Sequence, residues 1–174
     1  KVNAWLGLEP GSKLSLGSLY FVKVNQGLSA SEGTFTIEYP AASLFMTVIE
    51  PKVTGSYPAN GTDLGSAEWK KSGQGNYIST VESSFNHPIV FSSVYDKVVL
   101  SPLHKDQDTQ EDVQPNVNPG YEGTSLSITY NFKPSTEYTV TLKAGGTDLY
   151  GQKIAQDFTT KFTTAPLDPR LNLA

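Results

Sequence analysis

The stretch that decides the fold is "EYTVTLKAGGTDLYGQKIAQDFTTKFTT", residues 137–164. At its start, over Glu137–Ala144, Tyr138, Val140 and Leu142 alternate with two threonines and a lysine. Alternation with a period of two predicts a β-strand with one buried and one solvent-facing side. Glycine turns follow, and then a second, Thr-rich strand. The stretch therefore predicts the closing hairpin of a β-sheet protein.

Shorter strand patterns fill the preceding sequence, and helical periodicity is hard to find in it. We expect strands at Ser125–Phe132, Val98–Leu100, Val94–Tyr95, Val81–Phe85 and Phe158–Phe162. Two polar, turn-rich inserts separate them, Ala59–Asn76 and His104–Gly123, and the second is expected to be a long surface loop. Many short strands with regular turns predict an all-β fold, an Ig-like or fibronectin-III-like β-sandwich.

The composition limits the classes of function. Hydrophobic residues make up 37% of the chain and charged residues 17%, a balance typical of all-β extracellular domains. The net charge is −4 without any basic run, so nucleic acid is not expected as a partner. The absence of cysteine excludes disulfides, thiolate zinc sites and a cysteine nucleophile. No apolar run approaches the ~20 residues of a transmembrane helix.

The closing stretch has an echo near the start of the chain, "LYFVKVNQGLSASEGTFTIEYPAASLFMT", residues 19–47. Tyr20, Val22, Val24, Gly27 and Gly33 precede Tyr138, Val140, Leu142, Gly145 and Gly151 by 118 positions, and Phe45 and Thr47 precede Phe162 and Thr164 by 117. Upstream, Leu8-Glu9-Pro10 resembles Phe132-Lys133-Pro134, with six extra residues before the tyrosine. A period near 118 fits tandem sandwich domains.

The repeat predicts a domain organisation. Residues 1–49 are expected to be the C-terminal strands of an upstream module, residues 50–165 a complete Ig-like sandwich, and residues 166–174 a linker to a following domain. The fold prediction is thus one complete module preceded by part of a second.

The repeated residues have structural explanations. Tyr138 and Tyr20 are placed for a tyrosine corner, in which the hydroxyl bonds to backbone a few residues upstream. The glycines supply positive φ in turns, Asp148 bonds to backbone in its turn, and Phe162 and Phe45 fill the core. The expected structural positions are Tyr138, Gly145, Asp148, Gly151, Phe162, Tyr20, Gly27, Gly33 and Phe45. The alternatives are Tyr138 as a catalytic acid or ligand, and Asp148 as a metal ligand.

A search for catalytic and cofactor motifs gives no catalytic set, and no cofactor is expected. His87 and His104 lie 17 positions apart, which is no zinc spacing. The segment "KDQDTQED" begins like a calcium loop, which makes Asp106, Asp108 and Asp112 candidate calcium ligands, with Glu111 beside them. A solvated loop is the alternative. An aromatic platform for sugar could include Trp5, Trp69, Tyr77 and Tyr121, although such rings also occur in cores.

Three segments together resemble the S-layer-type bacterial Ig-like domain: "PKVTGSYPANG", "ISTVESSFNHPIVFSSVYDKVVLSP" and "FKPSTEYTVTLKAGGTDLYGQKIAQDFTTKFTT". The matching positions are Pro51, Val53, Pro58, Gly61, Phe85, Pro88, Val98, Leu100, Pro102, Tyr138, Val140, Asp148, Gly151, Phe162 and Thr164. The match covers most of Glu50–Ala165. Both inserts are longer than the family pattern, and Ile89 stands where methionine is common. Fibronectin type III domains share "KPSTEYTVTL" but lack the Asp-x-x-Gly and Phe-x-Thr ending.

The resemblance implies a non-enzymatic structural or interaction module of a bacterial cell-surface or secreted protein. Such domains occur in tandem, and the host is expected to be an alpha-2-macroglobulin-like protease trap. The reactive thioester of such a trap needs a cysteine, so it would lie outside this chain. The alternatives are an adhesion module that binds glycan or protein, and an accessory domain of a secreted hydrolase. The expected partners are neighbouring domains of the same polypeptide, together with other proteins or glycans.

Overall fold

The computed structural model describes residues 7–30, 34–71 and 78–167. The chain divides into two compact units, Lys1–Glu50 and Pro51–Ala174. We call them unit 1 and unit 2 and describe each by itself.

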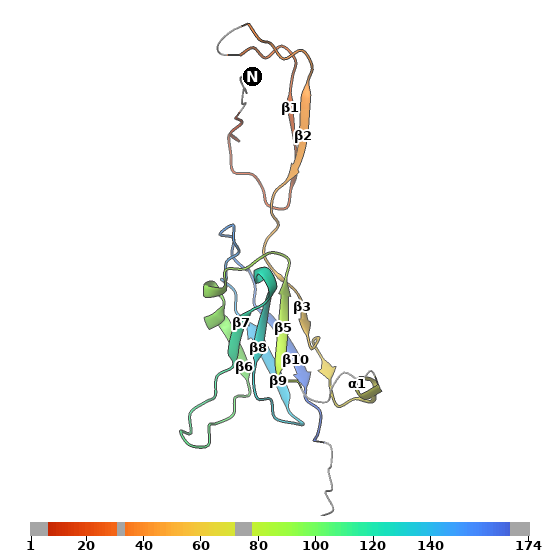
Figure 1. Cartoon of the computed structure of the whole chain (residues 1–174), viewed down its shortest axis with the longest axis vertical. Helices are drawn as coiled ribbons and strands as arrows, with labels where there is room; N and C mark the ends of the chain where they lie inside the picture. The colour runs from red at the N-terminus through yellow and green to blue at the C-terminus, as the bar shows by residue number, and fades with distance from the viewer. Residues whose placement is uncertain (1–6, 31–33, 72–77, 168–174) are drawn as a thin grey trace, which may run out of the picture. The chain divides into compact units, whose positions relative to one another are not determined.

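Unit 2 contains two four-stranded sheets within the described residues (Figure 1). One sheet has the strand order β3 (Val53–Tyr57), β5 (Thr80–Phe85), β8 (Ser125–Thr129) and β7 (Asn116–Pro119). The other has the order β4 (Thr62–Asp63), β10 (Phe158–Thr163), β9 (Glu137–Leu142) and β6 (Val98–Ser101). All neighbouring strands are antiparallel except β4 and β10.

The core of unit 2 lies between these sheets. Val81 and Ile128 from the first sheet pack with Tyr138, Val140 and Phe162 from the second in one buried cluster. A second cluster fills the other end of the sandwich with Phe85, Ile89, Val94, Leu126, Leu142 and Ile154. The buried positions of β8 and β9 alternate with more exposed ones, as a period of two requires. The predicted all-β sandwich is confirmed.

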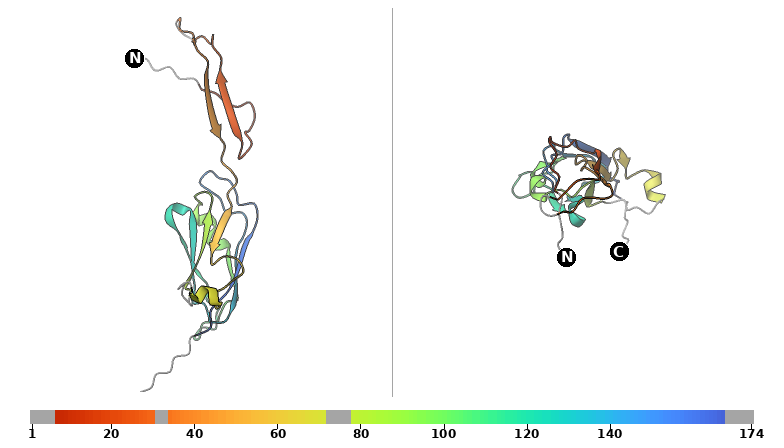
Figure 2. Two further views of the ribbon diagram at one scale, coloured as in Figure 1. Left: turned by 90° about the vertical axis from the view of Figure 1, so that its right-hand side faces the viewer. Right: turned by 90° about the horizontal axis from the view of Figure 1, so that it is seen from above.

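The first strand of unit 2 crosses from one sheet to the other. β3 pairs with β5, and after the buried Pro58 the chain pairs through β4 with β10. Ser56 joins the two layers at this point, because its hydroxyl lies 3.1 Å from the Thr160 hydroxyl of β10. Since β4 and β10 are parallel, the chain enters unit 2 at one end of the sandwich and leaves at the other (Figure 2).

The structure differs from the sequence expectations at one strand and at both inserts. The expected strand at Val94–Tyr95 is replaced by two 3-10 turns, η1 (Phe91–Ser93) and η2 (Tyr95–Lys97). The Val94 amide closes the first turn on the Phe91 carbonyl, and its side chain is packed so closely against Gly146 that a Cβ there would collide with it. Burial of one valine in the core, and not strand pairing, produced the apolar pattern.

The two inserts hold more regular structure than expected. Residues 104–123 include strand β7, which pairs with β8, and the 3-10 turn η3 (Tyr121–Gly123). β7 is an edge strand held by backbone hydrogen bonds, so its sequence needs no strong apolar alternation. The insert 59–76 contains β4 and the short helix α1 (Ala67–Lys71).

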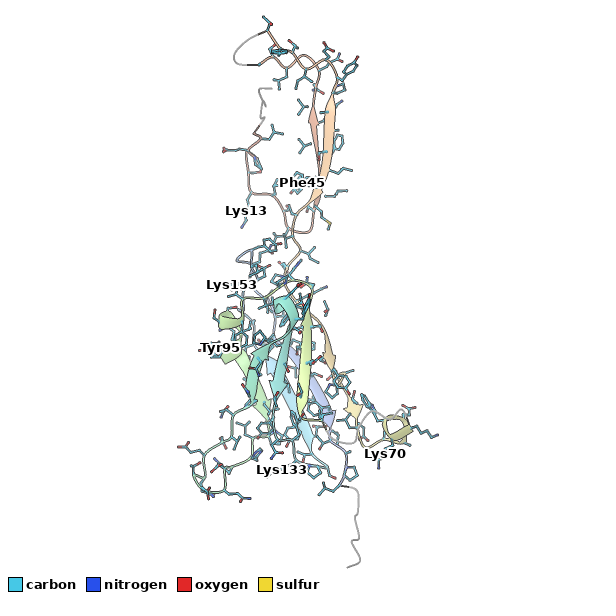
Figure 3. All side chains as sticks on the ribbon, viewed as in Figure 1. Lys13, Phe45, Lys70, Tyr95, Lys133 and Lys153 are labelled. Carbon is cyan, nitrogen blue, oxygen red and sulfur yellow. The ribbon has the colours of Figure 1, made fainter. Side chains whose placement is uncertain are left out.

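Within its described residues, unit 1 contains one antiparallel hairpin, β1 (Leu19–Val24) and β2 (Ala41–Met46). Tyr20 pairs with Phe45 across it, and the two rings are stacked. Phe45 stands on β2 at 42% exposure, and Figure 3 marks its position.

Truncation of the two equivalent phenylalanines should have very different effects. Phe162 is 1% exposed, so Phe162→Ala should lower the free energy of unfolding of unit 2 by about 3–5 kcal/mol. Phe45→Ala is the matched control and should leave unit 2 within about 0.5 kcal/mol of wild type. Urea titration followed by the NMR signals of β9 amides measures both values. Equal losses in the two variants would contradict separate cores.

Candidate functional site

The closing hairpin β9–β10 positions most of the residues that the sequence singled out. Tyr138 is buried, and its hydroxyl accepts a 2.9 Å hydrogen bond from the Lys133 backbone N–H. This is the geometry of a tyrosine corner. The ring stacks against Phe162 with the centroids 5.9 Å apart. At 1% exposure the Tyr138 hydroxyl faces backbone and core, and no substrate could reach it for acid catalysis.

Thr164 completes the corner. Its hydroxyl donates to the Lys133 carbonyl at 2.6 Å and accepts from the Thr136 backbone N–H at 2.9 Å. Both backbone groups of Lys133 are therefore bonded by side chains of residues farther along the chain. Sequence reasoning did not assign Thr164 this role. The available signal was its repetition as Thr47 together with the tyrosine.

The turn between β9 and β10 contains Asp148 and two of the predicted glycines. Asp148 is 1% exposed, and its Oδ1 accepts 2.8 Å hydrogen bonds from the backbone N–H groups of Tyr150 and Gln152. Gly145 and Gly151 have φ values of +95° and +77°, which other residues rarely adopt. Asp148 thus organises the turn that Gly151 ends. Among the described residues, its Oδ2 is buried without a hydrogen-bond partner.

A charged contact holds the base of this turn. Asp157 accepts hydrogen bonds of 2.8 Å from the Lys143 ammonium group and from the Ala144 backbone N–H. The Lys143 hydrogen bond, followed by that from Ala144, lowers the pKa of Asp157 below its ordinary value. The contact is exposed to solvent, so its role is to align the two strands and not to provide chemistry.

Two of the three calcium candidates, Asp106 and Asp112, bond to different partners. Asp106 Oδ1 accepts from the backbone N–H groups of Thr109 at 2.9 Å and Asp108 at 3.0 Å, and these bonds lower its pKa. Asp112 forms a 2.9 Å ion pair with Lys105. Across the described ranges, no group of three His, Cys, Asp or Glu side chains is arranged to hold a metal ion. Asp106 instead caps the start of a local turn.

The histidines and aromatic candidates lie in different surroundings. His104 is 4.7 Å from the ring of Tyr130, and its backbone N–H donates to the Tyr130 hydroxyl at 2.8 Å. Burial is the main cause of the raised pKa of Tyr130. His87 meets the ring of Tyr150 edge-on, and Trp69 lies 6.1 Å from the ring of Tyr57.

Tyr121 is 79% exposed on η3. The remaining candidates Trp5, Tyr77 and Gly33 lie outside the described residues.

A pocket of about 340 Å³ lies beside the corner, at the end of the sandwich where β10 finishes. Its lining is Ile78, Ser79, Tyr130, Asn131, Phe132, Pro134, Thr164 and Ala165. The described lining carries no carboxylate, imidazole or ammonium side chain, so it offers no acid–base pair.

The sandwich fold agrees with the family comparison. The family model described as the bacterial Ig-like domain matches residues 47–164, about two thirds of the chain. The chain belongs to the bacterial Ig-like domain family. The match extends over unit 2 and starts at the end of β2. Among the described residues of this family member, no helix is long and apolar enough to span a membrane.

Solved structures of similar proteins have low identity to this Ig-like chain. PcoC, a methionine-rich copper resistance protein from Escherichia coli, is 15% identical; the match covers 66% of this chain and 97% of that one, with a TM-score of 0.45. The N-terminal part of the bacterial S-layer protein SbsC is 16% identical, with 67% and 24% covered and a TM-score of 0.42. Domains 1–6 of SbsC are also 16% identical; the match covers 70% of this chain and 14% of that one, with a TM-score of 0.42. No curated protein matches the sequence.

Removal of the Thr164 hydroxyl should destabilise the Ig-like unit. Thr164→Val keeps the shape but leaves the Lys133 carbonyl and the Thr136 N–H without their partner, at a cost of about 1–3 kcal/mol. Thr159→Val on β10 is the control, because its hydroxyl makes an exposed 3.1 Å contact with the Thr141 hydroxyl and no buried backbone group depends on that contact. Urea unfolding compares the two variants. A smaller loss for Thr164→Val than for Thr159→Val would contradict the role of the corner.

Proposed function

We propose that unit 2 is a non-enzymatic spacer and docking module in a polypeptide that acts at the bacterial cell surface or outside the cell. Family membership supports this role. The polar side chains that could have taken part in catalysis support it too, because Tyr138, Thr164 and Asp148 are buried and bonded to backbone. The expected partners are the neighbouring domains of the same polypeptide.

The observation that carries the proposal is the parallel contact between β4, near the start of unit 2, and its last strand β10. Gly61 N–H donates to the Lys161 carbonyl at 2.7 Å, and Leu64 N–H donates to the Thr163 carbonyl at 2.9 Å. The Asn60 side chain adds a third contact, accepting from the Lys161 N–H at 2.9 Å. Tension between the two ends of unit 2 pulls parallel strands in opposite directions, so these bonds bear the load together. This arrangement suits a module that keeps its length under tension.

Single-molecule extension of the 174-residue chain by its ends tests the spacer role. Unit 2 should unfold in one force peak that releases about 40 nm, from ~115 residues at ~3.5 Å each. Asn60→Ala should lower the peak force, because it removes one of the loaded contacts. Thr54→Ala, which removes an exposed contact between β3 and the Ser84 carbonyl, should leave it unchanged. Unfolding without a resolved peak, or equal forces in both variants, would argue against the role.

For the host protein, we propose an alpha-2-macroglobulin-like protease trap. The "LEPG…LYFVKV" segment at the start and the "FTT-x-P" segment at the end of unit 2 support it by resemblance to the paired copies in such proteins. In this host the module would hold other domains at a fixed spacing. The chain has no cysteine, so a thioester would come from another part of the polypeptide.

The host proposal has its own test. Treatment of the full polypeptide with methylamine should open the thioester, add one methylamine to the protein and release one thiol. Intact mass measurement and thiol titration detect both changes. Absence of both would overturn the protease-trap host but not the spacer role, because the extension experiment does not depend on the thioester.

A further inference from the structure

The β1–β2 hairpin of unit 1 repeats the closing hairpin of unit 2 in its strand register. Tyr20 pairs with Phe45, as Tyr138 pairs with Phe162. The first pair of rings is stacked at 5.6 Å and 19°, and the second at 5.9 Å and 25°. The two hairpins therefore present the same ring pair on the same face.

The hydrogen bonds of the corner are repeated as well. Ser15 N–H donates to the Tyr20 hydroxyl at 2.7 Å, and the Thr47 hydroxyl donates to the Ser15 carbonyl at 2.6 Å. Thr47 also accepts from Ser18 N–H at 2.9 Å. Ser15 thus stands where Lys133 stands in unit 2, five residues before the tyrosine in both. The expected match of Leu8-Glu9-Pro10 to the segment before Tyr138 is wrong, and no six-residue insertion exists.

The turn that follows the first strand agrees in the same way. Gly27 has a φ of +87° and its N–H donates to the Ile37 carbonyl at 2.9 Å. Gly145, with a φ of +95°, donates to the Ile154 carbonyl at 2.9 Å. The hairpin of unit 1 is thus built as an Ig-like closing hairpin from corner to turn.

The two hairpins differ in what covers them. In unit 2, Val81 and Ile128 of the opposite sheet bury the face that carries Tyr138 and Phe162. In unit 1, no residue of the face that carries Tyr20 and Phe45 is buried, as far as the structure describes this unit. Both outer edges of the hairpin are also unpaired there, whereas β9 pairs with β6 and β10 with β4. Apolar faces and open edges are features that folded proteins cover.

We propose that β1–β2 closes a second Ig-like sandwich, and that the strands which cover it precede it in the same polypeptide. The covering sheet carries a Val- and Ile-rich face like that of β5 and β8. An antiparallel strand like β6 lies along β1, and a short parallel strand like β4 lies along β2. These covering strands are inferred from unit 2, because there the equivalent hairpin β9–β10 packs against the sheet of β5 and β8.

The position of the corner indicates that the covering strands come from the same polypeptide. In unit 2 the corner at Lys133 receives the chain directly from β8, a strand of the covering sheet. Ser15 makes the same bonds, so the chain reaches β1 from the side on which the covering sheet would lie. This inference does not depend on the spacer role of unit 2.

The opposite face of the hairpin needs separate treatment in any test. Leu19, Phe21, Leu44 and Met46 are exposed there, whereas β9 and β10 carry Glu137, Thr139, Lys161 and Thr163 at these positions. Contact between copies of the chain through this outer face would protect the hairpin, and it would hide whether the inner face with Tyr20 and Phe45 is covered. The double variant Phe21→Thr and Leu44→Lys gives the two central positions of the outer face the residues of unit 2 and weakens that contact.

Hydrogen exchange on this double variant tests the proposal. In the 174-residue chain, the amides of Phe21 and Lys23 should exchange rapidly, and the chain should sediment as a monomer. These two amides lie on the open edge of β1, as the equivalent Thr139 and Thr141 amides lie on the β6 side of β9. In a polypeptide extended at the N-terminus by about 100 residues of its natural sequence, the same amides should be protected at least a hundredfold more. Unchanged exchange in the longer polypeptide would overturn the proposal. Protection accompanied by dimer formation in the 174-residue chain would overturn it in favour of a second copy.

A graft provides a test that needs no further sequence. Residues 15–48 replace residues 133–165 in unit 2 of the full chain. The β1–β2 sequence then takes the place of β9–β10 in the sandwich of unit 2. The graft should unfold cooperatively in urea, since Tyr20, Val22 and Phe45 take the places of Tyr138, Val140 and Phe162. The same graft with Val22→Asp should not fold. Failure of the unmodified graft, or folding of the Asp variant, would count against an Ig-like core face on β1–β2.

Discussion

The fold of unit 2 depends on how the backbone of Lys133 is satisfied where the chain passes from one sheet to the other. β8 belongs to one layer and β9 to the other, so the residue between them has no strand partner for its N–H and carbonyl groups. Tyr138 and Thr164 provide those partners. Because the tyrosine ring also packs in the core with Val81 and Ile128 of the other layer, the same side chain fixes the corner and fills the space between the layers. Buried backbone groups are costly when unpaired, which is why a tyrosine and not a phenylalanine suits this position.

Local signals in the sequence were sufficient where a strand is half-buried, and insufficient where it lies at an edge or in a turn. The alternation of Tyr138, Val140 and Leu142 predicts β9, since a central strand must present one face to the core. β4 and β7 could not be predicted, because backbone pairing with distant residues defines them and their side chains carry little pattern. The apolar Val94 gives a false strand pattern for the opposite reason, because one buried side chain at the end of a 3-10 turn resembles a short strand in sequence.

The candidate site follows the same division between local and distant contacts. The turn around Asp148 can be inferred from its spacing to Gly151, since the hydrogen bonds of the Asp148 side chain both close within five residues. The spacing of Asp106, Asp108 and Asp112 looks equally regular, yet the Asp106 carboxylate bonds to its own turn and that of Asp112 to a lysine. Sequence spacing gives the separation of carboxylates along the chain but not the direction in which they point. The role of Thr164 requires the three-dimensional position of Lys133, 31 residues earlier.

Comparison of the two units separates what shapes a closing hairpin from what stabilises it. Corner, ring pair and turn have the same geometry in both, although the face is buried in one unit and not in the other. The geometry is therefore encoded within about 35 residues of sequence. An isolated two-stranded hairpin is only marginally stable in water, because few apolar contacts offset the loss of chain entropy. Local encoding gives β1–β2 its register, and the sheet that we propose to cover Tyr20 and Phe45 would supply its stability.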